Sequence, residues 1–107
     1  MSNTLERIKG LAKEGKIKIS EHGYDELAND DLTAREIIEG VLYSILLEDY
    51  PDYPKGPCVL VLQSDRNGDP VHVVWGMPKN HVQPAVLVTA YRPDPKLWDE
   101  KFMRRKQ

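Results

Sequence analysis

The stretch CVLVLQSDRNGDPVHVVWGMPKNHVQPAVLVTAYR, residues 58–92, decides the fold. It contains three apolar runs, residues 58–62, 71–77 and 85–92, separated by segments rich in Gly, Pro, Asn and Asp. β-Branched and aromatic side chains dominate these runs, which is typical of strands. The Asn-Gly step between the first two runs tolerates the positive φ of a tight turn. The stretch therefore predicts a three-stranded antiparallel meander.

The chain before this stretch predicts three helices. Residues 4–14 repeat apolar side chains at helical spacing, and Gly15 follows as a natural stop. Ser20 is a good N-cap for a second, short helix. Thr33 and Glu36 have the spacing of a capping box that opens a third helix. One apolar stripe runs along that helix: Ile37, Ile38, Val41, Leu42 and Ile45.

The remaining segments widen the sheet or flank it. Residues 16–19 read KIKI, an alternation that indicates a short edge strand. Residues 46–57 contain three prolines and predict a short strand that passes into a loop. Residues 96–105 predict a short C-terminal helix. We therefore expect a single α+β domain over residues 1–107, with N-terminal helices packed on one face of a C-terminal antiparallel sheet of three to four strands.

Composition limits the classes of function. A chain of 107 residues supports one core, and its apolar runs are far too short to span a membrane. No secretory signal is expected, and a lone cysteine, Cys58, suits a reducing cytoplasm. One thiol and three histidines give no zinc-ribbon spacing, so neither a metal nor a cofactor is expected. The net charge of −2 argues mildly against avid nucleic-acid binding, although the last seven residues carry four cations.

Two histidines are candidates for acid–base chemistry. His22 lies in the first turn of the second predicted helix, where the helix dipole favours the neutral imidazole that a general base requires. The alternative is a histidine that packs on the sheet with one nitrogen bonded to backbone. Period two places His72 on the strand face opposite to the apolar one, and we expect that face to be partly open. Its neighbours on the next strand are either Thr89 with Tyr91 or Val88 with Ala90 and Arg92, because the register is not fixed by the sequence.

Three further candidates close the last predicted strand. Thr89 and Tyr91 share one face, and Arg92 points the other way unless the strand twists or bulges. An arginine stabilises a developing phosphate charge, and a tyrosine hydroxyl relays a proton. The alternative for Thr89 and Tyr91 is plain strand propensity.

Five pieces of the chain, in this order, resemble a known family. They are ISEH at residues 19–22, LTAREI at 32–37, LEDYPD at 47–52, GDPVHVV at 68–74 and VTAYRPDP at 88–95. Together they are similar to the small bacterial family catalogued as domain of unknown function 4258, over about residues 17–100. Members of that family resemble RelE-like and barnase-like ribonuclease toxins, which use no metal, and some are paired with a zinc-ribbon, helix-turn-helix antitoxin.

This resemblance implies a first hypothesis, a cytoplasmic RNase-like toxin that cleaves RNA by attack of a 2′-hydroxyl on the adjacent phosphate. It implies His22 and His72 as the acid and base, Arg92 as charge stabiliser, and Thr89 and Tyr91 as secondary groups. The hypothesis predicts that the two histidines approach each other across a groove near Arg92. The slightly acidic charge departs from the strongly basic RelE-like pattern. The second hypothesis is a non-catalytic module that binds a protein partner through the acidic residues 48–52, and it predicts an apolar or acidic exposed patch with dispersed histidines.

Overall fold

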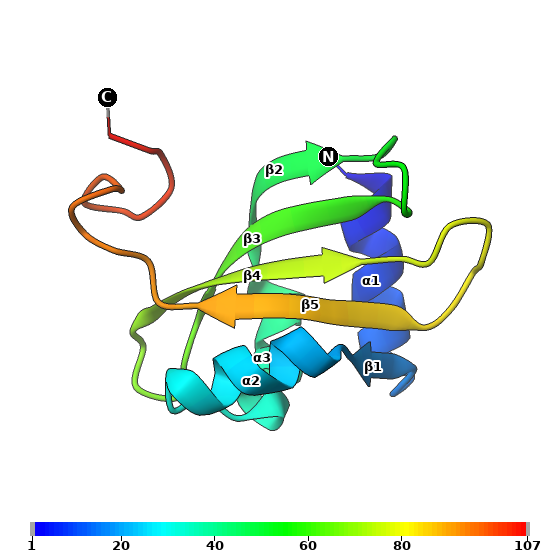
Figure 1. Cartoon of the computed structure of the whole chain (residues 1–107), viewed down its shortest axis with the longest axis horizontal. Coiled ribbons are helices and arrows are strands. Elements are labelled where there is room, and N and C mark those ends of the chain that lie inside the picture. The colour runs from blue at the N-terminus through cyan, green and yellow to red at the C-terminus, as the bar shows by residue number, and fades with distance from the viewer. Residues whose placement is uncertain (1, 107) are drawn as a thin grey trace.

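A computed structural model of the chain describes residues 2–106 (Figure 1). Its elements follow in chain order: α1 (Asn3–Lys13), β1 (Ile17–Ile19), α2 (Glu21–Asn29), α3 (Ala34–Gly40), a 3₁₀ turn η1 (Val41–Tyr43), β2 (Ile45–Tyr50), β3 (Cys58–Ser64), β4 (Pro70–Gly76) and β5 (Ala85–Tyr91).

The sheet is five-stranded and mixed, in the order β1-β5-β4-β3-β2. The predicted meander of β3, β4 and β5 is confirmed, and β2 joins it antiparallel. The prediction of a purely antiparallel sheet of three to four strands is wrong, because β1 pairs with β5 in parallel. The chain leaves α1 at the far edge of the meander, where the backbone of residues 17–19 meets the free edge of β5. The parallel pairing could not be predicted, because the two strands are far apart in sequence and no local pattern indicates it.

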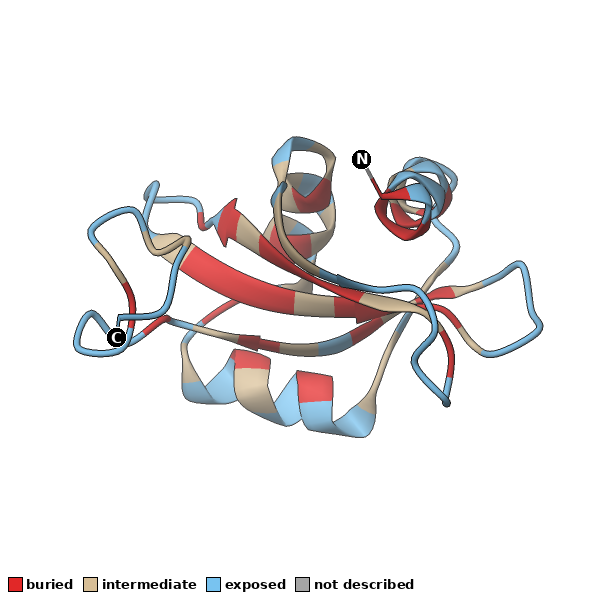
Figure 2. Cartoon of the chain, turned by 90° about the horizontal axis from the view of Figure 1, so that it is seen from above, coloured by how far each residue is buried: buried red, intermediate tan, exposed pale blue. Residues whose placement is uncertain are grey.

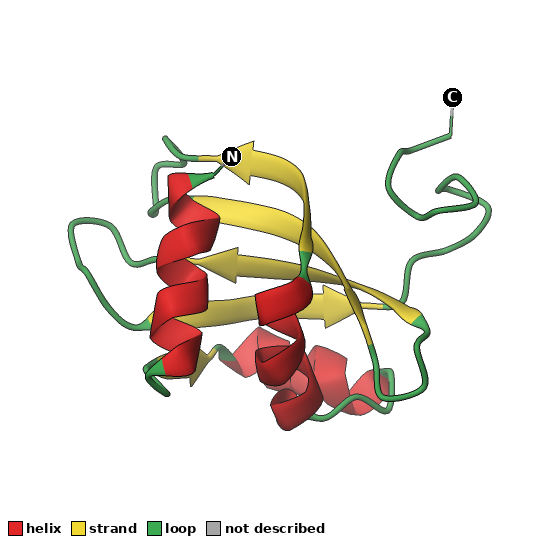
Figure 3. Ribbon diagram, turned by 180° about the vertical axis from the view of Figure 1, so that it is seen from behind, coloured by secondary structure: helices red, strands yellow, loops and turns green. Residues whose placement is uncertain are grey.

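The helices lie on two sides of the sheet, not on one as predicted. Figure 2 shows α1 and α3 on one side and α2 on the other, and Figure 3 shows α1 and α3 across the nearer face. The Ser20 hydroxyl, which caps α2, also donates to the Val88 carbonyl at 2.8 Å, so this helix runs along β5. The α1 and α3 side buries the central apolar residues of the strands: Val59, Val61, Val71, Val73, Trp75 and Leu87.

The third helix ends earlier than its apolar stripe predicts. The capping box of Thr33 and Glu36 is confirmed, with the Glu36 carboxylate 2.7 Å from the Thr33 backbone nitrogen. The α-helix stops at Gly40 and a 3₁₀ turn follows. Ile45, the last residue of the stripe, instead opens β2 and pairs with Leu62. Sheet pairing thus overrides the helical pattern at this position.

The predicted C-terminal helix at residues 96–105 is wrong. This segment forms turns closed by an isolated bridge between Trp98 and Arg105. The Asp99 carboxylate accepts hydrogen bonds from the backbone nitrogens of Met103 and Arg104, which draws the loop together. Phe102 has φ of 57°, a left-handed conformation that no α-helix contains. In residues 2–106 we also find no helix with the length and apolar character that a membrane crossing needs.

Candidate functional site

The side of the sheet away from α1 and α3 carries a groove of about 640 Å³. We call this side the open face. The groove lies over β3, β4 and β5 and is bordered at one end by the β2–β3 loop and at the other by the C-terminal segment. Its floor is apolar: Cys58, Leu60, Val74, Gly76, Val86 and Val88. A volume of this size is typical of sites that bind small molecules or a few side chains of a partner.

Local irregularities shape the groove. Gly76 has no side chain and so leaves the middle of the groove open. A Cβ atom at this position would already be in van der Waals contact with Val88, at 3.4 Å. The β4–β5 register shifts next to Val74, so that Val88 is the extra residue of a β-bulge. Tyr50 and Tyr53 stand at the rim and are about half exposed. Three exposed hydrophobic side chains, Tyr50, Tyr53 and Val88, therefore lie at this groove. Other exposed hydrophobic residues lie outside it: Tyr24, Tyr43, Ile45, Val82 and Leu97.

The structure settles the strand register around His72. His72 pairs with Tyr91, so its neighbours are the set of Thr89 and Tyr91. It points away from the core side, as predicted. The prediction of a partly open position is wrong, because His72 has no exposed surface. The C-terminal segment covers it with Trp98, whose ring centroid lies 4.3 Å from the imidazole in an edge-to-face contact.

Both nitrogens of His72 have partners. Nε2 lies 2.7 Å from the Phe102 carbonyl oxygen, and Nδ1 lies 3.4 Å from the Tyr91 hydroxyl. Burial lowers the pKa of His72, although the hydrogen bond to Phe102 acts in the opposite direction. The ring is therefore neutral near pH 7 and closed to any substrate while the segment stays in place.

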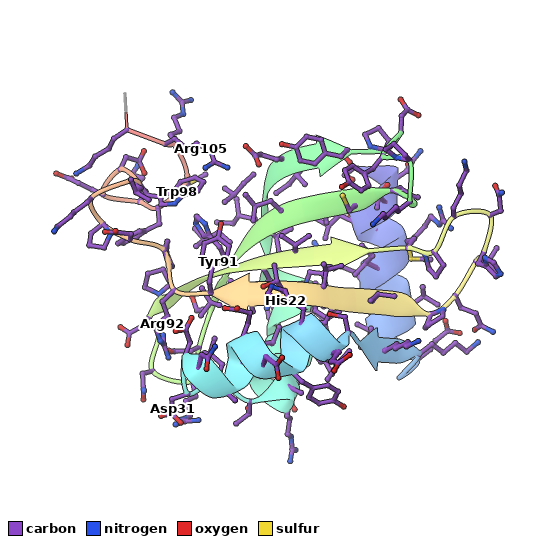
Figure 4. The ribbon with its side chains drawn as sticks, in the orientation of Figure 1. His22, Asp31, Tyr91, Arg92, Trp98 and Arg105 are labelled. Atoms are coloured by element: carbon purple, nitrogen blue, oxygen red, sulfur yellow. The ribbon has the colours of Figure 1, made fainter. Side chains whose placement is uncertain are left out.

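His22 lies in a different environment. It occupies the first turn of α2, and its side chain is 65% exposed, with Nε2 3.8 Å from the Glu26 carboxylate. Figure 4 shows it in front of β5, on the same side of the sheet as the open face. The two histidines thus share a side of the molecule, but each has its own partners and only His22 is accessible to solvent.

Arg92 is held at the sheet corner. Its Nη1 atom lies 2.8 Å from the Asp65 carboxylate, and its backbone nitrogen donates to Asp30 at 3.1 Å. Burial alone would raise the pKa of Asp65, but backbone donors at Asp69 and Asn67 together with Arg92 hold it below its ordinary value. The guanidinium is therefore neutralised by a buried carboxylate and turned away from the groove.

Sequence reasoning missed the polar end of the groove. There, Glu48 of β2 and Arg105 of the C-terminal segment approach to 3.7 Å, with the Arg105 Cζ atom 4.8 Å from the Trp98 ring centroid. Figure 4 shows Trp98 and Arg105 beside Tyr91 at the end of β5. The only sequence signals were an acidic segment in the middle of the chain and a basic segment at its end. The sequence alone does not show that these two segments lie close together.

The described residues hold no cluster of three or more His, Cys, Asp or Glu side chains placed to bind a metal. The observed arrangement defines a small α+β domain with an open sheet face and a groove on it. The chain matches the family model described as "Domain of unknown function (DUF4258)" over residues 19–92, and it belongs to that family. No curated protein and no solved structure was found to match.

Proposed function

We propose that this chain is a protein-binding module, and that the groove on its open face receives an apolar segment of a partner protein. The single observation that carries the proposal is an apolar groove floor rimmed by half-exposed tyrosines, on the part of this sheet face that α2 leaves uncovered. Such a patch stabilises a complex because association removes it from water. The lone cysteine suits the cytoplasm, where we place the protein.

Charge selects the kind of partner. α2 borders the open face on one side with three acids, Glu21, Asp25 and Glu26. On the other side Glu48 lines the groove together with the cations Lys55 and Arg105, and Asp52 lies in the β2–β3 loop. The three acids of α2 disfavour a phosphate backbone on that side and attract lysines and arginines that flank an apolar segment. We therefore propose a partner segment with apolar residues at its centre and basic residues at its ends. The family resemblance makes an antitoxin protein a candidate for this partner.

A ribonuclease remains the second candidate, and one observation favours it. His72, Thr89 and Tyr91 gather on the same sheet face, and His22 lies on the same side. Against it, His72 is sealed beneath the C-terminal segment, and Arg92 is paired with Asp65. Catalysis by this set would require the segment to move and another cation to stabilise the phosphate.

A peptide selection tests the binding module. The purified chain is used to select from a random displayed-peptide library, and selected peptides are synthesised for titration calorimetry. We expect peptides with a central apolar segment and flanking basic residues. Val88→Asp places a charge on the groove floor and should weaken their binding at least tenfold. Val82→Asp is the matched control, since Val82 is an exposed valine in the β4–β5 loop outside the groove.

Two results would overturn the proposal. One is a selection that yields no peptide above background, or peptides that bind equally well to Val88→Asp and to the control. The other is cleavage of single-stranded RNA without metal that both His22→Ala and His72→Ala abolish. That second result would make the ribonuclease the correct assignment.

A further inference from the structure

At the end of the groove, the positive charge of Arg105 lies between a carboxylate and an aromatic ring. Glu48 supplies the carboxylate, which also raises the pKa of the nearby Tyr50. Trp98 supplies an aromatic face. The guanidinium of Arg105 fills the space between them, 3.7 Å from the Glu48 carboxylate and 4.8 Å from the centre of the Trp98 ring. A carboxylate and an indole face together are the surroundings that organic cations prefer.

The carboxylate and the ring are fixed while the guanidinium between them is not. Trp98 is buried and packs edge-to-face on His72. Glu48 is held in β2 opposite Leu60. The side chain of Arg105, in contrast, is 65% exposed, and its ion pair with Glu48 is long. An exposed pair at this distance is weak, so the side chain of Arg105 can leave Glu48 while its backbone stays in the bridge with Trp98.

We propose that Glu48 and Trp98 form a subsite for a guanidinium or ammonium group of the bound partner, and that Arg105 occupies this subsite until the partner displaces it. This inference rests on the proposed function and adds one specific contact to it. A partner segment whose apolar residues fill the floor near Val88 would bring its flanking cation to Glu48, because both residues line the same groove. Arg105 is then an internal competitor that weakens binding.

Peptide affinities test the competition. The probe is a selected basic peptide and its counterpart with citrulline in place of the arginine nearest the apolar segment. Arg105→Ala should bind the arginine peptide several-fold more tightly than the unmodified chain does. Glu48→Gln should bind it several-fold more weakly and lose the preference for arginine over citrulline. Arg105→Ala should have no effect in the Glu48→Gln background. Arg104→Ala, at the neighbouring exposed arginine, is the control and should leave affinity unchanged.

A second measurement needs no partner. N-acetyl-arginine methylamide is titrated into the labelled chain while amide signals of residues 48–50 are followed, with the citrulline analogue as control. We expect saturable shifts in Arg105→Ala, smaller ones in the unmodified chain and none in Glu48→Gln.

Peptides that bind equally well to all variants, or equal shifts with both amides, would overturn the subsite while the groove proposal stands. Failure to select any peptide would overturn the groove proposal. The arginine amide would then decide alone whether the cation pocket exists.

Discussion

The Nε2 atom of His72 lies 2.7 Å from the carbonyl oxygen of Phe102, thirty residues further along the chain. This contact closes the C-terminal segment over a strand position that the alternation of side chains places outside the core. Trp98 and Tyr91 pack against the other sides of the ring. The imidazole therefore anchors the segment to the sheet, and a role for it in chemistry would require that anchor to break.

Burial of His72 predicts a loss of stability in mild acid. Burial lowers the pKa of this histidine in the folded chain, while in the unfolded chain it stays near 6.5. Below pH 6.5 the unfolded state binds a proton that the folded state resists, so the free energy of unfolding falls with pH until the folded pKa is reached. Between pH 6.5 and 5.5 the free energy of unfolding falls by at most about 1.4 kcal/mol, because a difference of one bound proton changes it by that amount per pH unit. Urea unfolding at pH 7.5 and pH 5.5 measures it.

The matched variants for this prediction are His72→Gln and His81→Gln. His81 is exposed in the β4–β5 loop, so its replacement should keep the pH dependence. Replacement of His72 should remove it. The acids whose pKa values are lowered, Glu36, Asp65 and Asp99, titrate at lower pH and leave this window clear. If the free energy of unfolding of His72→Gln still fell between pH 7.5 and pH 5.5, His72 would not be the source of the pH dependence.

Local patterns predicted most of the fold. The meander, the capping box at Thr33 and Glu36, and the edge strand at residues 16–19 all depend on neighbours within a few positions. The parallel pairing of that edge strand with β5, and the contact that holds the segment after Pro93 against His72, depend on residues far apart in sequence. Propensity alone did not distinguish a helix at residues 96–105 from a loop closed by Asp99.

The groove could not be predicted for the same reason. Its floor comes from three strands and its polar end from β2 and the C-terminal segment. The alternation in β4 correctly placed His72 opposite to Trp75, but exposure depends on what covers a face. The positions of Trp98 and Phe102 in the C-terminal segment determine that His72 is sealed.

The ion pair of Asp65 and Arg92 predicts a structural role for both residues. The Asp65 side chain is 2% exposed and accepts bonds from two backbone nitrogens of its own turn as well as from Arg92. Arg92→Ala would leave this buried carboxylate without its cation and should lower the free energy of unfolding by about 1–3 kcal/mol. Arg35→Ala breaks an exposed pair on α3 and should cost less than about 0.5 kcal/mol. Equal costs in urea unfolding would show that the Asp65 pair is no stronger than a surface pair.

Removal of Trp98 should release the C-terminal segment from His72. Trp98→Ala deletes a buried ring and should lower the free energy of unfolding by about 3–5 kcal/mol. Water then reaches the imidazole, so the pKa of His72 should rise toward its ordinary value, which an NMR titration of the ring protons measures. Leu97→Ala, at an exposed neighbour in the same segment, should change neither quantity. A His72 pKa that stays low in Trp98→Ala would mean that other groups keep the ring dry.

Two helical glycines should respond in opposite directions to the same substitution. Gly10 lies in α1, and nothing approaches within 4 Å of the place where its Cβ atom would be. Gly10→Ala should raise the free energy of unfolding by about 0.5–1 kcal/mol, because alanine loses less conformational freedom in a helix. At Gly23 in α2, a Cβ atom would lie 2.8 Å from the Leu87 carbonyl oxygen, so alanine must push the helix off β5. We expect Gly23→Ala to cost about 1–3 kcal/mol. It should also alter the amide signals of residues 86–89, which include the groove-floor residues Val86 and Val88. Stabilisation by both substitutions in urea unfolding would show that α2 packs more loosely on β5 than the 2.8 Å approach requires.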